Sequence, residues 1–144
     1  MKVSRTAISQ FCDDIRHEVG NKYSLMGCYG NELLVENLPA LLPKLCVQVR
    51  VITPIDKPVS KLIIRALMND DIIAEMNVAS DKTVPQIPSG MDNPVRTELS
   101  VVMTFSPLPI TEPSKLRIEA EADDEVLRGG ILLFRESSPN NHTS

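Results

Sequence analysis

Apolar and polar residues alternate along several segments of the chain. The cleanest case is 44–52, where four apolar residues face one way: Leu45, Val47, Val49 and Val51. The same period of two recurs in four further segments, 61–68, 72–78, 97–106 and 115–122. Side chains alternate between the two faces of a β-strand, so this pattern predicts strands with one face buried and the other in water.

Turn-forming residues separate these segments. Asn69-Asp70-Asp71 and Asp123-Asp124 each lie between two alternating segments and predict hairpin turns, because Asn and Asp tolerate positive φ. Gly129-Gly130 interrupts a strand expected over 126–134 and predicts a β-bulge. Near the N-terminus, we expect a strand over Ala7–Cys12, a polar turn that ends at Gly20-Asn21, and a second strand from Tyr23. Within that turn we expect Asp13–Val19 in an extended or turn conformation, with one helical turn as the alternative.

Together these segments predict an all-β fold, an immunoglobulin-like or C2-like antiparallel β-sandwich of about eight or nine strands. A jelly-roll sandwich is a further alternative. The sandwich is expected to be a single domain over 1–135, with 1–6 as a loose lead-in and 136–144, ESSPNNHTS, as a disordered polar tail. Segment 79–96 contains three prolines and is expected to be a long loop without strands.

Composition adds the character of the core. The chain has 144 residues, of which 42% are apolar but only 3% aromatic, and it contains no Trp. The core is therefore expected to be aliphatic. Eleven prolines against six glycines favour many short segments with stiff connections, which fits strands better than helices.

Charge and cysteine content exclude several classes of protein. The formal net charge is −4, which disfavours nucleic-acid binding because that needs a basic surface. No apolar run approaches the roughly 20 residues of a membrane span, and the N-terminus lacks the apolar core of a secretory signal. The three cysteines, Cys12, Cys28 and Cys46, have no paired spacing and predict reduced thiols in a cytoplasmic protein.

Two runs of residues carry a resemblance. The run F-C-D-D-I-R-x-E-x-G-x-K-x-S-L-x-G-x-Y-G starts at Phe11, and L-P-K-L-C-V-x-V-R-V starts at Leu42. With these runs the chain resembles a family of uncharacterised bacterial and bacteriophage proteins, a domain of unknown function. The likeness extends from about Ala7 to Phe134 and is clearest before Val51. It implies a small soluble domain in bacteria or their phages, and it implies no reaction and no functional residues.

Two segments are candidate binding surfaces. The first combines the expected polar turn with the only two tyrosines of the chain, and it consists of Asp13, Asp14, Arg16, His17, Tyr23 and Tyr29. We expect the two tyrosines on one face of their strand. The second is the 79–96 loop, where Ile87 and Met91 could contact a partner.

No complete catalytic or metal signature is present. Cys12, Asp13, Asp14 and His17 are close in sequence, but a closed zinc site needs four ligands at recurring spacings and there is no second Cys/His pair. A Cys12–His17 nucleophile pair lacks an orienting group, and the Asp pairs at the hairpin turns already have a local role there without calcium. We therefore expect no metal, no cofactor and no catalytic residue.

The expected function is a non-enzymatic protein-binding module. The resemblance suggests a phage or prophage accessory protein that engages or inhibits a host protein, such as part of a defence system. One alternative is a structural, virion-associated sandwich that forms homo-oligomers. Another is capture of a small ligand such as a nucleotide, which would need convergent basic residues, with the candidates Arg50, Arg65, Arg96 and Arg117.

Overall fold

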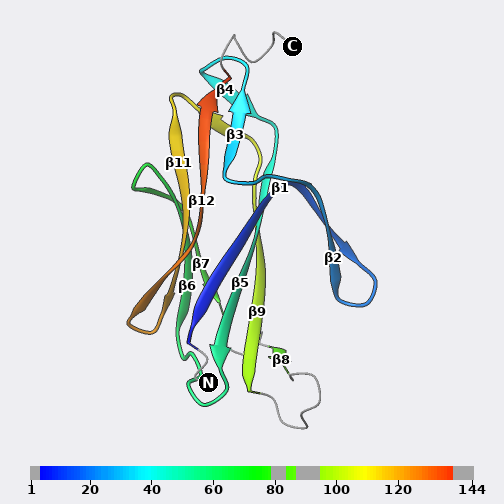
Figure 1. The fold of residues 1–144 in the computed structure, drawn as a ribbon, viewed down its shortest axis with the longest axis vertical. Helices are drawn as coiled ribbons and strands as arrows, with labels where there is room; N and C mark the ends of the chain where they lie inside the picture. Colours follow the sequence, from blue (N-terminus) through cyan, green and yellow to red (C-terminus); the bar gives the residue numbers. More distant parts are fainter. Residues whose placement is uncertain (1–3, 79–83, 87–94, 138–144) are drawn as a thin grey trace.

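The fold consists of strands throughout the part of the chain that is described. A computed structural model describes residues 4–78, 84–86 and 95–137 (Figure 1). Within these ranges there are twelve strands and no helix, so the predicted all-β class is confirmed. They form two five-stranded sheets and one two-stranded sheet.

The first sheet has the strand order β2-β1-β5-β9-β8, and every ladder in it is antiparallel. Its strands are β1 (Thr6–Glu18), β2 (Lys22–Cys28), β5 (Leu45–Pro54), β8 (Val84–Gln86) and β9 (Arg96–Phe105). β8 lies inside 79–96, so the prediction of a loop without strands over that whole segment was wrong. A three-residue strand adds to the edge of β9 there.

The second sheet has the order β3-β12-β11-β6-β7. Its strands are β3 (Glu32–Val35), β6 (Leu62–Met68), β7 (Asp71–Val78), β11 (Ser114–Ala122) and β12 (Glu125–Glu136). The β3–β12 ladder is parallel, and the other ladders are antiparallel, as predicted. β12 reaches Glu136, the first residue of the predicted polar tail, and 138–144 of that tail lie outside the described residues.

The two large sheets pack face to face around one aliphatic core (Figure 1). The alternation predicted for β5 is confirmed, because Leu45, Val47, Val49 and Val51 are all buried. The opposite sheet contributes another alternating set of buried residues, Leu116, Ile118, Ala120, Ala122, Leu132 and Phe134. The core contains few aromatic rings, as the composition predicted.

The strand count differs from the eight or nine expected because short strands were missed. Residues 40–42 lie between Pro39 and Pro43 and form β4 (Ala40–Leu42). β4 pairs with β10 (Leu108–Ile110) in the two-stranded sheet. Proline is tolerated in such edge strands, where its missing N–H can face away from the ladder.

Turn chemistry follows the prediction closely. Asn69 and Asp70 form a two-residue loop between β6 and β7, and both have positive φ, as a type I′ hairpin turn requires. The predicted bulge is present, since Ile118 faces Gly130 while Glu119 faces Arg128. The intervening Gly129 is the extra residue of β12.

Candidate functional site

A two-stranded ribbon extends from the first sheet. β1 pairs with β5 from Thr6 to Cys12, and it pairs with β2 from Cys12 to Glu18. Figure 1 shows β2 projecting away from the packed sheets. The predicted strand Ala7–Cys12 therefore ended too early, and of the conformations expected for Asp13–Val19 the extended one is present up to Glu18. The chain remains a strand to Glu18, because β2 supplies backbone partners for it, and it turns at Gly20 and Asn21, both with positive φ.

The acidic pair Asp13 and Asp14 does not form one site. The Tyr29 hydroxyl donates a hydrogen bond to Asp13, whereas Lys44 donates one to Asp14 at 2.6 Å. The Lys44 hydrogen bond lowers the pKa of the Asp14 carboxyl. Each carboxylate thus has its own partner, and neither partner is shared.

His17 and Tyr23 form a separate contact farther along the ribbon. Their ring centroids lie 4.8 Å apart in an edge-to-face arrangement. Arg16, the residue before His17 on β1, is exposed. Within the described ranges, no three His, Cys, Asp or Glu side chains gather where they could hold a metal ion.

The two tyrosines do not share a surface, so that prediction was wrong. Tyr23 packs on a small cluster formed by Cys12, Ile15 and Cys46, whereas Tyr29 packs against the main core. Gly27 lies between them with φ +67°, a conformation in which the regular alternation of a strand is broken. Periodicity counted through Gly27 therefore assigns the two rings to the wrong faces.

The second predicted surface cannot be compared in the same way. Ile87 and Met91 lie outside the described residues. The nearest described part of their segment is β8, Val84–Gln86, which pairs with β9.

The ribbon exposes apolar as well as charged side chains. Val19, at the turn, is 94% exposed, and Met26 on β2 is also exposed. β2 is the terminal strand of its sheet, with β1 as its one neighbour among the described strands. The ribbon therefore presents a strand edge, an apolar tip and the charged residues Arg16, Glu18 and Lys22.

Three of the four arginines proposed for nucleotide capture already have carboxylate partners. Arg65 and Arg117 lie in the second sheet, whereas Arg50 lies in the first, so these side chains do not converge. The ion pairs are Arg50–Glu98, Arg65–Glu75, Arg65–Glu121, Arg117–Asp70 and Arg117–Glu119. Arg96 is exposed at the start of β9. These pairs leave the nucleotide alternative without a supporting observation.

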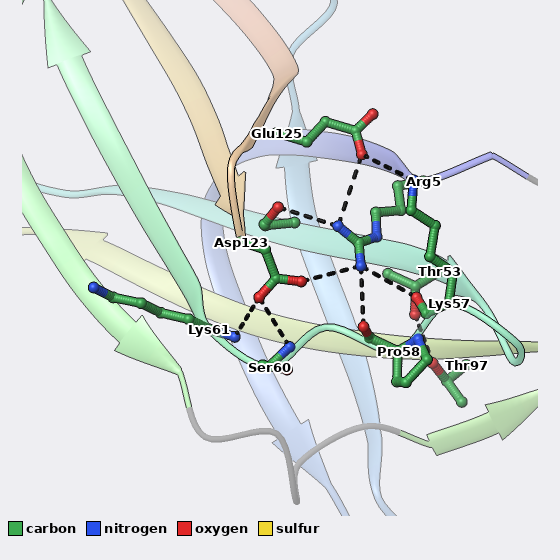
Figure 2. A network of polar contacts seen from close by, with 10 residues as sticks. Arg5, Thr53, Lys57, Pro58, Ser60, Lys61, Thr97, Asp123 and Glu125 are labelled. Carbon is green, nitrogen blue, oxygen red and sulfur yellow. Dashed lines mark hydrogen bonds and ion pairs between the residues drawn. The ribbon is translucent and has the colours of Figure 1, made fainter.

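A buried arginine, which sequence reasoning had placed in a loose lead-in, anchors the N-terminus. The Arg5 side chain is only 5% exposed. Its guanidinium donates to the backbone carbonyls of Ala122 at 3.1 Å, Pro58 at 3.0 Å and Lys57 at 3.3 Å, and to the Asp123 carboxylate at 3.1 Å (Figure 2).

Asp123 completes this network from the turn between β11 and β12. Its carboxylate accepts the backbone N–H groups of Ser60 at 3.1 Å and Lys61 at 3.0 Å. These bonds, above all that from Lys61, lower the pKa of Asp123. The network joins three separate segments, and Asp123 therefore contacts residues beyond its own turn.

The three cysteines are free thiols, two of them buried, as predicted, but their spacing in the sequence did not show that they are neighbours. Cys12 lies directly opposite Cys28 on one side and Cys46 on the other, so all three form one row across β2, β1 and β5. Cys12 and Cys46 are buried, whereas Cys28 is exposed. The register between paired strands brings the three cysteines together, and the number of residues between cysteines in the sequence does not reveal that register.

Comparison with known proteins gives a family and no function. Over the described ranges the chain has no helix long and apolar enough to cross a membrane. No significant similarity to a curated protein or to a solved structure was found. The sequence model of a family of unknown function, DUF6941, matches residues 7–132. That match spans both large sheets and the ribbon, and the chain therefore belongs to the DUF6941 family.

Proposed function

We propose that this chain is a non-enzymatic protein-binding module whose contact surface is the β1–β2 ribbon. In this proposal it acts in the cytoplasm as an accessory protein of a phage or prophage and engages or inhibits a host protein, such as part of a defence system. The projection of the ribbon beyond the packed sheets is the observation that carries the proposal.

The backbone of β2 supports binding by strand addition. An edge strand has unpaired N–H and C=O groups, and an extended segment of a partner can pair with them. β2 has β1 on one side and, among the described strands, no neighbour on the other. Seven residues, Lys22–Cys28, are long enough for a ladder of ordinary strand length.

The side chains of the ribbon support specificity. Val19 is almost fully exposed at the tip, and a protruding apolar side chain can fill a pocket in a partner. Arg16, Glu18 and Lys22 are exposed within a few positions of it and add charges of both signs, as in the polar rim of an interface. The partner expected from this chemistry is a protein with a free strand edge and an apolar pocket beside it.

A pull-down with matched variants tests the proposal. Tagged wild-type chain is incubated with bacterial host lysate, and bound proteins are quantified by mass spectrometry. Val19→Glu tests the ribbon, and Val126→Glu is the control, because Val126 is also exposed but lies at the β11–β12 turn. We expect one stoichiometric partner whose recovery falls at least about tenfold with Val19→Glu, the loss expected for one interface anchor, and stays unchanged with Val126→Glu.

Two results would overturn the proposal. Either no protein is recovered near stoichiometry, or the partner binds both variants equally well. The second result would place the contact away from the ribbon.

A second candidate function, self-assembly, rests on another surface. The outer face of β12 and β3 exposes three aliphatic side chains, Leu34, Ile131 and Leu133. Neighbouring exposed apolar residues of this kind often mark a protein interface. Light scattering of the pure chain distinguishes this candidate: a defined oligomer that Ile131→Lys converts to monomer would support assembly, and a monomeric wild type would reject it.

A further inference from the structure

The three cysteines form a linear row across three neighbouring strands. Cys28 on β2 faces Cys12 on β1, and Cys12 in turn faces Cys46 on β5. Side chains of directly opposite residues lie on the same face of a sheet, with Cβ atoms about 4.5–5.5 Å apart. Each outer thiol is therefore adjacent to the central thiol of Cys12.

The backbone hydrogen bonds identify the closer pair. The N–H of Tyr29 donates to the carbonyl of Phe11 at 2.8 Å, one residue beyond the Cys12–Cys28 pair. Because hydrogen-bonded and non-hydrogen-bonded pairs alternate, Cys12 and Cys28 form a non-hydrogen-bonded pair. Such residues have Cα atoms about 4.5 Å apart, with their side chains closer than in the other type.

The pair with Cys46 is of the wider type. The N–H and C=O of Cys12 point away from β2 and toward β5, so Cys12 and Cys46 are a hydrogen-bonded pair with Cα atoms about 5.5 Å apart. Disulfides span Cα separations of about 4.4–6.8 Å, so distance alone permits either bond. Solvent access distinguishes them, because Cys28 is exposed and Cys46 is buried.

We propose that Cys12 and Cys28 are a reversible disulfide site that is oxidised by hydroperoxides. The Cys28 thiolate attacks one peroxide oxygen and the O–O bond breaks, which gives a sulfenic acid on Cys28. The leaving oxygen takes up the proton that the Cys28 thiol released on ionising, and it departs as water or an alcohol. The Cys12 sulfur then attacks the Cys28 sulfur, the S–O bond breaks, and water leaves with the thiol proton. Two thiols thus supply the two electrons that reduce one peroxide.

The position of each thiol assigns its role. Cys28 is on an edge strand and meets solvent, so it is the residue that a peroxide reaches. Burial raises the pKa of the Cys12 thiol to about 11, which keeps Cys12 protonated and protects it from direct oxidation. Cys46 lies on the far side of Cys12, 3.7 Å from the Thr104 hydroxyl, and takes no part.

A linear row also argues against a three-thiolate metal site. Cys28 and Cys46 lie on opposite sides of Cys12, so the three sulfurs do not surround one point. This agrees with the lack of a metal-binding cluster among the described residues. A bond between two neighbours is the chemistry that the row permits.

A disulfide would act at the base of the ribbon. Gly27, next to Cys28, has φ +67°, and an added Cβ there would collide with the Asp13 carboxylate, so β2 already lies close against β1 beside the cysteine pair. The bond would tie β2 to β1 at the base of the ribbon when oxidised and release it when reduced.

Intact-mass and peptide analysis of the full chain tests this inference. Reduced wild type, Cys28→Ser and Cys46→Ser are treated with hydrogen peroxide, unfolded, and alkylated with N-ethylmaleimide. We expect wild type and Cys46→Ser to become lighter by two hydrogen atoms before alkylation, to take up two fewer maleimide groups than the reduced chain, and to yield a linked Cys12–Cys28 peptide. Dithiothreitol should restore both thiols, and Cys28→Ser should keep its two remaining thiols.

Three other results would overturn the inference. The first is oxygen adducts on Cys28 without a linked peptide. The second is a disulfide between two chains through Cys28, and the third is a linked peptide that contains Cys46. Cys28 is exposed, so its replacement by Ser leaves the core intact and the comparison valid.

Discussion

Arg5 donates a hydrogen bond to Asp123 at 3.1 Å, although 118 positions separate the two residues in the chain. Figure 2 shows the guanidinium enclosed between the Asp123 turn and the loop that contains Lys57 and Pro58. The contact closes the end of the sandwich at which β1 begins, since it joins the segment before β1, the loop before β6, and the β11–β12 turn.

Removal of the Arg5 side chain should destabilise the fold. Arg5→Ala deletes four hydrogen bonds from a side chain that is almost fully buried, and we expect a loss of about 2–3 kcal/mol in the free energy of unfolding. Urea unfolding measures it. Arg16→Ala is the matched control, because Arg16 is exposed on the ribbon and its loss should leave the midpoint almost unchanged. Equal midpoints for the two variants would contradict a stabilising role for the network.

The network should also weaken in acid. Hydrogen bonds from the Lys61 and Ser60 backbone and from Arg5 favour the ionised carboxylate, so the pKa of Asp123 lies below its ordinary value of 3.8 in the folded chain. A lowered pKa adds stability above 3.8, and that stability is lost as the pH falls through the folded value. Urea midpoints measured as the pH falls from 3.8 should therefore drop less steeply in Asp123→Asn than in wild type. Identical pH profiles would show that Asp123 makes no such contribution.

The bulge on β12 should require glycine at position 130. Gly130 has φ +132°, and an added Cβ would lie 3.3 Å from the Cβ of Ser9 on the facing sheet. We expect Gly130→Ala to cost about 1–3 kcal/mol through backbone strain. Gly30→Ala is the control, since nothing lies within 4 Å of its added Cβ. Thermal unfolding compares the two, and a Gly130→Ala variant as stable as Gly30→Ala would disprove the strain.

Tyr29 should titrate at unusually high pH. Burial, together with its hydrogen bond to the Asp13 carboxylate, raises the pKa of Tyr29 to about 12 from an ordinary 10.0. The Tyr23→Phe variant leaves Tyr29 as the sole tyrosine, so phenolate absorbance then reports on it directly. Further replacement Asp13→Asn should lower this pKa but leave it above 10.0, because burial, the first of its causes, is unchanged. A pKa at 10.0 before the Asp13 replacement would mean that neither effect operates.

The raised pKa of Tyr29 also predicts how the stability of the fold changes at alkaline pH. The folded chain favours the protonated phenol, so the contribution of Tyr29 to stability is complete below pH 10.0 and declines as the pH rises toward 12. Unfolding midpoints followed across that range should fall less in Tyr29→Phe than in wild type. A decline of the same size in both would assign alkaline unfolding to other groups.

Local signals predicted the elements that depend on neighbouring residues. Alternation identified the buried face of β5, Asn69-Asp70 identified the hairpin turn, and Gly129-Gly130 identified the bulge. These features follow from steric rules that act over a few residues. The same rules failed where a partner strand changed the outcome, as for Asp13–Glu18, which β2 holds in an extended conformation.

The sequence by itself determined an all-β chain with an aliphatic core, its main strands and most of its turns, because period and turn chemistry are local properties. The tertiary structure decided which residues meet. It brought Arg5 to Asp123, aligned Cys28, Cys12 and Cys46 in one row, and separated Tyr23 from Tyr29. Pairing register and sheet packing join segments that are distant along the chain, and their energies depend on partners that no local pattern contains.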